Sequence, residues 1–550
     1  MSRARRIRKQ QKEGTKPTAR SLPRETPVPR AGWLLGAAFL LPNLGALGCR
    51  FVLDDLPLIV ENEKLHSLAN IVAICRSGYW PDRRGLEYRP VTQAIWAALW
   101  SAGGGHAFLF HLFGLLLGLA VVLLAYRFLV QLQAPPRTAF TAALLFALFP
   151  IHTEATTSVV GSAELLAAAF GLGSLLLYAG GRRIAALALF ALAVFSKESA
   201  AAFAALPLAL PALRPAGIVP PASRLPDSGR QPQQAAERRR VAGPNRACGT
   251  PAVQRGDHPG SPLHRDLATA AVAAAIIGAA LLVHRGVSRT GFVPPIDNPM
   301  ALLDPARRVL SALWVQCLYI FKTVLPIWLS ADYSYQQIPL VMSLDDGRAW
   351  AGLGLVAAAG LAAWRYRQLR PAVLTYAILF SATANVLFPI GTMMGERLAY
   401  APGIGLALLL AMPLASVRQW KAVLIAVALL YGGRTVVRNL DWRNPEVFYT
   451  RLIDTSPASA KSHYFYGILL SSRGDDNGAV ATYDHAIAIF PAYSEAYHNR
   501  GNALARLGRR EEAAESYAAC LRFDPGHMGA AANLAALRAG LPLSPPRKRL

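Results

Sequence analysis

The sequence predicts an all-α protein, in which a polytopic transmembrane helical bundle of about 11 spans is followed by an α-solenoid of short helical repeats. Of its 550 residues, 53% are hydrophobic and only 16% are charged, which is too apolar for an ordinary soluble chain of this length. The apolar residues gather in nearly uncharged runs, such as 108–130 and 267–283, and such runs match a hydrocarbon core of roughly 30 Å. After Arg438 the pattern changes to a repeating one.

The apolar runs place the crossings along the predicted membrane domain, residues 32–437. They lie near residues 32–48, 105–130, 137–152, 158–179, 183–196, 198–213, 267–284, 350–364, 371–389, 398–416 and 420–436. The run 309–328 is also apolar, but a crossing there would put basic turns on the wrong side, so we expect it to be re-entrant or to pack along the interface. Alternatively, 183–213 forms one tilted helix and 309–328 crosses. Either choice gives an odd number of spans, which puts the two ends of the chain on opposite sides of the membrane.

The formal net charge of +25 is concentrated beside apolar spans. Much of it lies in the N-terminal segment 1–31 and in the Pro-, Gly-, Arg- and Gln-rich stretch 214–266, and a short basic tail closes the chain at 542–550. Lys and Arg in such places keep a loop cytoplasmic. We therefore expect a cytoplasmic N-terminus with a retained signal anchor, a disordered cytoplasmic loop at 214–266 and an extracytoplasmic C-terminal domain, in a bacterial inner membrane. Nucleic acid is excluded as a partner because no basic stretch is interleaved with stacking aromatic residues.

The cysteines indicate neither a zinc site nor a disulfide framework. The five of them show no Cys-x-x-Cys or His/Cys ligand spacing. Cys49 and Cys75 could pair in an extracytoplasmic loop, but we expect them not to. No metal and no cofactor is predicted.

The C-terminal segment 438–541 carries a repeat of 34 residues, seen in Pro457, Pro491 and Pro525. Within this interval the same residue types recur, as in Gly467 with Gly501, Leu470 with Leu504, and Tyr483 with Tyr517. This period, with small residues in each helix, an aromatic in the second and a closing proline, is the tetratricopeptide signature. Small residues let paired helices approach, the tyrosine fills the groove, and the proline ends the second helix.

Charged residues in or beside the apolar spans are the candidates for chemistry, because such residues are costly in a membrane. Asp54 and Asp55 follow the first span on the extracytoplasmic side, where a carboxylate can act as a general base on a hydroxyl. Alternatively, the pair belongs to an ordinary polar loop or caps a helix. The other candidates are Tyr88, Arg89, His152, Glu154, Glu164, Lys197, Glu198, Asp332, Tyr333, Tyr335, Glu396, Arg397 and Tyr400.

These candidates place cations and carboxylates around one predicted extracytoplasmic cavity. Arg and Lys suit a phosphate, and a carboxylate beside them suits a hydroxyl nucleophile. Glycosyl transfer from a lipid phosphate needs both. Alternatively, Lys197 with Glu198 and Glu396 with Arg397 are structural ion pairs between neighbours, and His152 is a capped helix end.

Eight short blocks carry a resemblance to a known family. They begin at Phe51 (FVLDD), Glu87 (EYRP), Phe149 (FPIHTEA), Gly161 (GSAELL), Phe195 (FSKES), Leu329 (LSADYSY), Phe388 (FPIGTMMGER) and Arg438 (RNLDW). In this order, and followed by the repeats, they resemble the transmembrane and tetratricopeptide-repeat O-mannosyltransferases and their bacterial relatives, which belong to the GT-C superfamily. The resemblance covers roughly residues 32–540, but the repeat array is shorter than in the animal members, and the insert 220–265 has no recognised counterpart.

The resemblance implies a GT-C-like bundle that takes sugar from a polyprenyl-phosphate carrier with inversion at the anomeric carbon. The general base would be Asp54 or Asp55, with a slight preference for Asp55. Donor phosphate and sugar would be bound by a set of polar residues, of which three supply the cations. This set is Arg89, His152, Glu154, Lys197, Glu198, Asp332, Tyr333, Glu396 and Arg397.

Three functions follow as hypotheses. The first is transfer of a sugar, with mannose the leading candidate, to Ser or Thr hydroxyls of an exported protein that the repeats engage. The second keeps the donor but sends the sugar to a lipid or polysaccharide. The third is a non-catalytic membrane-anchored scaffold, which has no evident need for so many charges on one side of the membrane.

Overall fold

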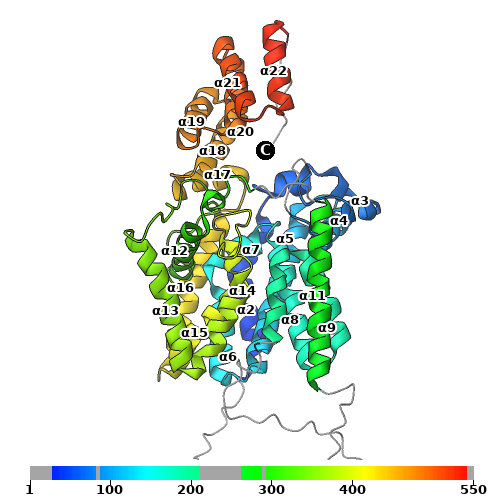
Figure 1. The fold of residues 1–550 in the computed structure, drawn as a ribbon, viewed down its shortest axis with the longest axis vertical. Coiled ribbons are helices and arrows are strands. Elements are labelled where there is room, and N and C mark those ends of the chain that lie inside the picture. The colour runs from blue at the N-terminus through cyan, green and yellow to red at the C-terminus, as the bar shows by residue number, and fades with distance from the viewer. Residues whose placement is uncertain (1–27, 82–86, 208, 210–261, 288–292, 542–550) are drawn as a thin grey trace, which may run out of the picture.

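The computed structural model describes residues 28–81, 87–207, 209, 262–287 and 293–541 (Figure 1). All regular secondary structure in these residues is helical, and none of them forms a β-strand. The prediction of an all-α fold is confirmed. The predicted basic segments 1–31, 214–266 and 542–550 lie almost wholly outside the described residues.

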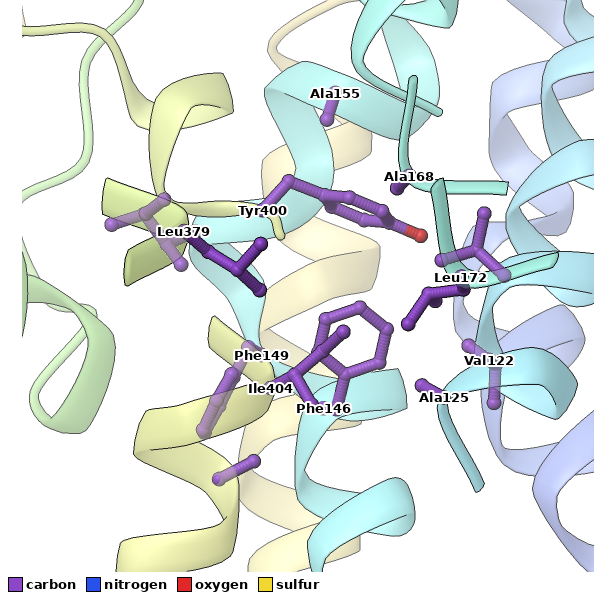
Figure 2. Close-up of a cluster of buried hydrophobic side chains, with 14 of the residues drawn as sticks. Val122, Ala125, Phe146, Phe149, Ala155, Ala168, Leu172, Leu379, Tyr400 and Ile404 are labelled. Atoms are coloured by element: carbon purple, nitrogen blue, oxygen red, sulfur yellow. The ribbon is translucent and has the colours of Figure 1, made fainter. Parts of the chain in front are cut away.

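Long helices run alongside one another to form a bundle (Figure 1). They are α2 (Ala31–Asn43), α5 (Ala107–Gln131), α6 (Pro136–Leu148), α8 (Ser162–Ala179), α9 (Arg183–Ser196), α11 (Pro262–Val287), α13 (Gly347–Arg365), α14 (Arg370–Ser381), α15 (Gly403–Ser416) and α16 (Trp420–Leu440). One buried cluster joins α5, α6, α8 and α15. Figure 2 shows part of it, with Phe146 and Ile404 near Val122 and Leu172.

In the part of the chain that the structure describes, four helical segments are long and apolar enough to cross a membrane. They are α2 with its 3-10 extension to Gly48, α5, α8 and α16. A fifth span would form if α6 and the next segment, Pro150–Thr157, crossed together, with a bend of 51° between them. These helices make the chain a membrane protein. Three more apolar helices are shorter over the residues whose side chains the structure describes, namely Arg183–Ser196, Ala268–Val283 within α11, and Gly403–Ser416. The number of about 11 spans therefore stays a prediction.

The apolar run 309–328 forms most of helix α12 (Pro305–Val324), which packs against α13. One side of α12 is buried and carries Tyr319, whereas Phe321 on the other side is exposed. The Tyr319 hydroxyl donates to the Gly395 carbonyl and accepts from the Gly395 amide, both at 3.0 Å. Helix α12 therefore holds the segment that precedes Glu396. Its predicted re-entrant or interfacial placement stays a prediction.

The C-terminal repeats form a stack of helices at one end of the bundle (Figure 1). They are α17 (Pro445–Thr455), α18 (Ala460–Ser472), α19 (Asp476–Ile489), α20 (Ser494–Arg506), α21 (Arg510–Phe523) and α22 (Met528–Arg538). A Cβ atom on Gly467 would lie 2.6 Å from the Tyr483 ring, and one on Gly501 would lie 2.7 Å from the Tyr517 ring. The predicted role of glycine and tyrosine at equivalent repeat positions is confirmed.

The second of these helices, α18, is fixed to the loops between α11 and α13. The Lys461 ammonium lies 2.5 Å from a carboxylate oxygen of Asp297. The Ser459 hydroxyl donates to the Asp332 carboxylate, and the Tyr335 and Phe490 rings lie 5.0 Å apart between centroids. These contacts hold the repeats against one end of the bundle, which we call the repeat end.

Candidate functional site

The two neighbouring carboxylates of the first loop have different surroundings. Asp55 is 1% exposed and accepts hydrogen bonds from the amides of Val160, at 2.9 Å, and Val52, at 3.2 Å. Burial raises the pKa of Asp55 to about 7, although these amides oppose the shift. The Asp54 side chain is 28% exposed. Asp55 therefore ties the first loop to the turn before α8, and Asp54 is the carboxylate that a substrate can reach.

Arg397 connects Asp54 to Glu154. It lies in the short 3-10 helix Glu396–Ala399, and its Nη2 is 3.7 Å from the Asp54 carboxylate. Its Nη1 donates to Glu154 Oε1 at 3.0 Å, and its backbone amide donates to Glu154 Oε2 at 3.0 Å. Glu154 belongs to α7 (Thr153–Thr157) and is almost fully buried. Three segments far apart in the sequence thus meet at one guanidinium group.

Two further ion pairs lie near helix ends, one just before α4 (Pro90–Gly103) and the other just after α9. The Arg89 Nε, just before α4, lies 3.1 Å from Glu198, and the Arg89 guanidinium stacks over the Tyr79 ring at 4.5 Å. The Lys197 ammonium, at the end of α9, pairs with Glu164 in α8, and both side chains are buried. Lys197 and Glu198 are therefore not a pair of neighbours, because each has a partner on another segment.

These pairs and Arg397 form a single electrostatic group. The positive charges of Arg89 and Arg397 both act on the Lys197 ammonium, and the negative charge of Glu164 acts on both arginines. A narrow cavity opens beside Glu164, between Ser199, Phe203 and Leu398. We define the site by the residues that share these contacts, which are Asp54, Arg89, Glu154, Glu164, Lys197, Glu198 and Arg397.

Glu396 and Tyr333 lie in a buried network next to Arg397. The Tyr333 hydroxyl donates to Glu396 Oε1 at 2.6 Å, and the Ser330 amide donates to the same oxygen at 2.7 Å. Glu396 Oε2 lies 3.4 Å from the Arg438 guanidinium, which also pairs with Asp441 at 3.1 Å. Burial raises the pKa of Glu396 to about 7, and Arg438 opposes this shift. Glu396 is fully buried, so it supports the site and does not face it.

Two other predicted residues have structural partners elsewhere. The His152 Nδ1–H donates to the Phe146 carbonyl at 3.0 Å, and the buried imidazole lies 4.7 Å from the Tyr400 ring between centroids. Asp332 accepts from the hydroxyls of Ser334 and Ser459 and so belongs to the contact between bundle and repeats. Among the described contacts, neither side chain forms an ion pair or hydrogen bond with the site group.

Residues that the sequence did not single out also belong to this region. Lys461 of α18 is close enough to Asp54 to respond to its charge: burial opposes the charged ammonium, but Asp297, Asp332 and Asp54 together raise the pKa of Lys461. Arg438 lies in one of the eight blocks, which could have identified it. No local signal identifies Lys461, because its contacts depend on how the repeats dock.

The described residues contain no group of three or more His, Cys, Asp and Glu side chains that could hold a metal ion. The prediction that no metal is needed remains untested. The four described cysteines, Cys49, Cys75, Cys317 and Cys520, are free.

The fold and the site define a class: an all-helical membrane bundle with paired cations and carboxylates at the end that carries tetratricopeptide repeats. Comparisons with known proteins agree with this class. Residues 291–360 match the family model described as protein O-mannosyl-transferase TMTC, DUF1736. Residues 467–508 and 494–527 match tetratricopeptide-repeat models.

Several animal proteins are similar to the chain over most of its length. Protein O-mannosyl-transferase F38B6.6 of Caenorhabditis elegans is 24% identical over 83% of this chain and 62% of its own length. Protein O-mannosyl-transferase TMTC3 of Mus musculus is 25% identical over 86% of this chain and 52% of its own length. Protein O-mannosyl-transferase TMTC4 of Homo sapiens is 25% identical over 79% of this chain and 63% of its own length. The chain thus spans less than two thirds of the length of these relatives. The comparisons therefore agree with the resemblance to transmembrane and tetratricopeptide-repeat O-mannosyltransferases that the eight sequence blocks carry.

Proposed function

We propose that this protein is a glycosyltransferase that moves a sugar, with mannose the first candidate, from a polyprenyl-phosphate carrier to Ser or Thr hydroxyls of proteins. The observation that supports this most directly is the position of Asp54, a partly exposed carboxylate 3.7 Å from the Arg397 guanidinium. A hydroxyl nucleophile needs a base, and a departing phosphate needs a cation. This contact supplies both within one site.

In the proposed reaction the acceptor hydroxyl oxygen forms a bond to the anomeric carbon of the sugar. The bond between that carbon and the carrier phosphate oxygen breaks, and the hydroxyl proton passes to the Asp54 carboxylate. Attack opposite the leaving phosphate inverts the anomeric carbon. The phosphate leaves as polyprenyl phosphate with one more negative charge than it had in the donor, so a cation that contacts it is favoured most strongly as the bond breaks.

The three predicted phosphate-binding cations differ in how well they suit this role. Arg397 and Arg89 are partly exposed, with side-chain exposures of 25% and 12%, whereas Lys197 is buried against Glu164. Arginine also presents several donors in a fixed plane, so it can keep a carboxylate partner and bind a phosphate oxygen as well. We therefore assign donor phosphate to Arg397 and Arg89, and to Lys197 a positioning role.

The repeats are proposed to engage the acceptor protein on the extracytoplasmic side. In support, α18 is fixed to the repeat end of the bundle, and its Lys461 lies within electrostatic reach of Asp54. An acceptor segment bound along the repeats would therefore enter the site from α18. With the N-terminus cytoplasmic, the predicted odd number of spans would put both the site and the repeats outside.

The test uses the purified full chain with polyprenyl-phosphate mannose and a Ser/Thr-rich peptide, and the product is identified by mass spectrometry. We expect one hexose on a peptide hydroxyl and none with Asp54→Asn. A matched control is Asp345→Asn, which changes an exposed aspartate far along the chain and should leave transfer intact. A hexose found only on lipid or polysaccharide would favour the second hypothesis, and no donor consumption at all would reject both enzymatic functions.

A further inference from the structure

An open groove of about 530 Å³ lies where the first span, α16 and the repeats meet. One wall is formed by Gly48 at the end of the first span, by Arg50 just after it, and by the segment 443–446 after α16. The other wall comes from the end of α18, at Leu469, Ser472 and Arg473. The groove shares no residue with the site around Asp54.

The groove is lined by three arginines and one carboxylate. Arg50 and Arg443 are brought together because the Arg50 amide donates to the Arg443 carbonyl at 3.0 Å. Arg473, on the opposite wall, pairs with Glu446 at 2.5 Å. The lining therefore carries a net charge of +2, and like charges gathered from the bundle and the repeats repel one another unless an anion lies between them.

The two helix ends that lead to the groove expose apolar side chains. Leu41 and Leu44 at the end of the first span, and Val437 and Leu440 at the end of α16, are all exposed. These two helix ends touch, since the Asn439 side-chain amide donates to the Pro42 carbonyl at 3.1 Å. Both helices are long and apolar enough to cross a membrane, so exposed leucine and valine here face lipid tails. The arginines then lie at the depth of the head groups.

We propose that this groove binds the phosphate of an anionic phospholipid, whose acyl chains run along these apolar helix ends. A phosphate suits the planar donors of arginine. The Asn444 side chain already accepts from the Val447 amide at the start of α17, so the arginines, and not the helix end, supply the binding groups. A lipid bound there bridges Arg50 and Arg443 of the bundle to Arg473 of the repeats, and it fixes the repeats over the site.

The groove lies directly beyond the ends of two apolar helices, and this position favours a lipid over a soluble anion or an acidic peptide. A soluble phosphate would use only the arginines, and an acidic peptide would leave the leucine and valine side chains without a role. The two alternatives are therefore outcomes of the test and not part of the proposal.

The experiment measures the thermal midpoint of the purified full chain in detergent as phosphatidylglycerol is added. Phosphatidylcholine, inorganic phosphate and a poly-glutamate peptide serve as comparison ligands. We expect phosphatidylglycerol to raise the midpoint at concentrations where the others do not. The variant Arg50→Gln/Arg443→Gln should need at least about tenfold more phosphatidylglycerol for half of that shift, because it removes two charged donors to the phosphate.

A matched control is Arg522→Gln/Arg538→Gln, which removes two exposed charges from the repeats away from the groove and should respond like the unmodified chain. If the double groove variant does not fold, Arg473→Gln provides the second test, since its side chain is 43% exposed. An equal response of groove and control variants would overturn the proposal. So would an equal shift from inorganic phosphate or the peptide.

Discussion

The Asp54 carboxylate and the Arg397 guanidinium lie 3.7 Å apart, although their positions in the sequence differ by 343. The Glu154 carboxylate holds Arg397 in place. It accepts one hydrogen bond from the Arg397 guanidinium and one from the Arg397 backbone amide, both at 3.0 Å. The arginine therefore has one buried carboxylate that fixes it and one partly exposed carboxylate that faces the substrate side. This asymmetry separates a positioning residue, Glu154, from the proposed base, Asp54.

We predict that the two neighbouring aspartates respond oppositely to replacement by asparagine. Asp54→Asn should lower transfer by roughly 10²–10⁴-fold, the range of a lost general base, with little change in the thermal midpoint. Asp55→Asn should cost about 1–3 kcal/mol in unfolding free energy, because an amide group accepts through one oxygen only and leaves one backbone amide unpaired. Transfer rates per folded molecule and melting curves in detergent check both. An intact rate in the first variant, or a larger loss of rate in the second, contradicts the assignment.

A second prediction concerns the shape of the cation at position 397. Arg397→Lys keeps the charge but cannot reach Glu154 and a phosphate at once, so we expect a loss of about 10–100-fold in kcat/KM. Arg397→Met should be worse, because Glu154 then stays buried without its partner. The measurement is steady-state transfer at several donor concentrations. Full activity in Arg397→Lys would show that charge alone is needed.

The buried pair Lys197–Glu164 gives a third prediction, a double-mutant cycle. Either single change, Lys197→Met or Glu164→Gln, leaves one uncompensated buried charge and should cost about 3–5 kcal/mol. The combined variant should recover much of that loss. Because Lys197 is assigned a positioning role, the recovered protein should keep part of its transfer activity. If the double variant folds and has none, Lys197 contacts the donor directly.

The sequence predicted the repeats well because their signal is periodic and local. Gly467 and Tyr483 are both fixed by the 34-residue interval, and their contact is confirmed. Several residues that the sequence proposed for the site also lie together in the structure, although their roles stay predictions. The sequence could not predict which charged residues form ion pairs with each other. The backbone of Lys197 is extended, so the side chains of Lys197 and Glu198 point in different directions and reach different helices.

The choice between Asp54 and Asp55 illustrates the same limit. Which of two successive carboxylates is buried depends on the turn that contains them, and Leu53 adopts a left-handed φ of 51° there. That conformation is rare for leucine and has no sequence signal. Contacts between the bundle and the repeats also have no signal in the sequence. Lys461 and Asp297 are 164 residues apart, and only the docking of the repeats brings them together.

Gly161 provides a fourth prediction, because it packs against the backbone of Glu154 and Ala155. A Cβ atom there would be 2.7 Å from the Glu154 carbonyl oxygen and 2.8 Å from the Ala155 Cα, and backbone cannot yield as a flexible side chain can. Gly161→Ala should therefore displace Glu154 and with it Arg397, which lowers transfer. The matched control is Gly354→Ala, where nothing lies within 4 Å. Equal activity of the two variants would show that Glu154 does not position Arg397.

The last prediction concerns the dependence of stability on pH. Burial raises the pKa of Glu396 from its ordinary value of 4.5 to about 7. Between these values the folded protein binds more protons than the unfolded chain, so unfolding free energy falls as pH rises from about 4.5 to about 7 and is level above that. The Glu396 contribution is about 3 kcal/mol. Asp55, whose pKa is also raised to about 7, adds a slope of the same sign.

Glu396→Gln should remove about half of this slope, because glutamine does not titrate and its oxygen can still accept from Tyr333 and Ser330. Arg438 keeps Asp441 as its partner in the variant. The measurement is the thermal midpoint in detergent between pH 4.5 and pH 8, with Glu511→Gln, an exposed change in the repeats, as the control. We expect the thermal midpoint of the variant to rise relative to that of the unmodified chain as pH rises. A constant difference across the range would mean that Glu396 stays ionised throughout, and that its pairing with Arg438 outweighs its burial.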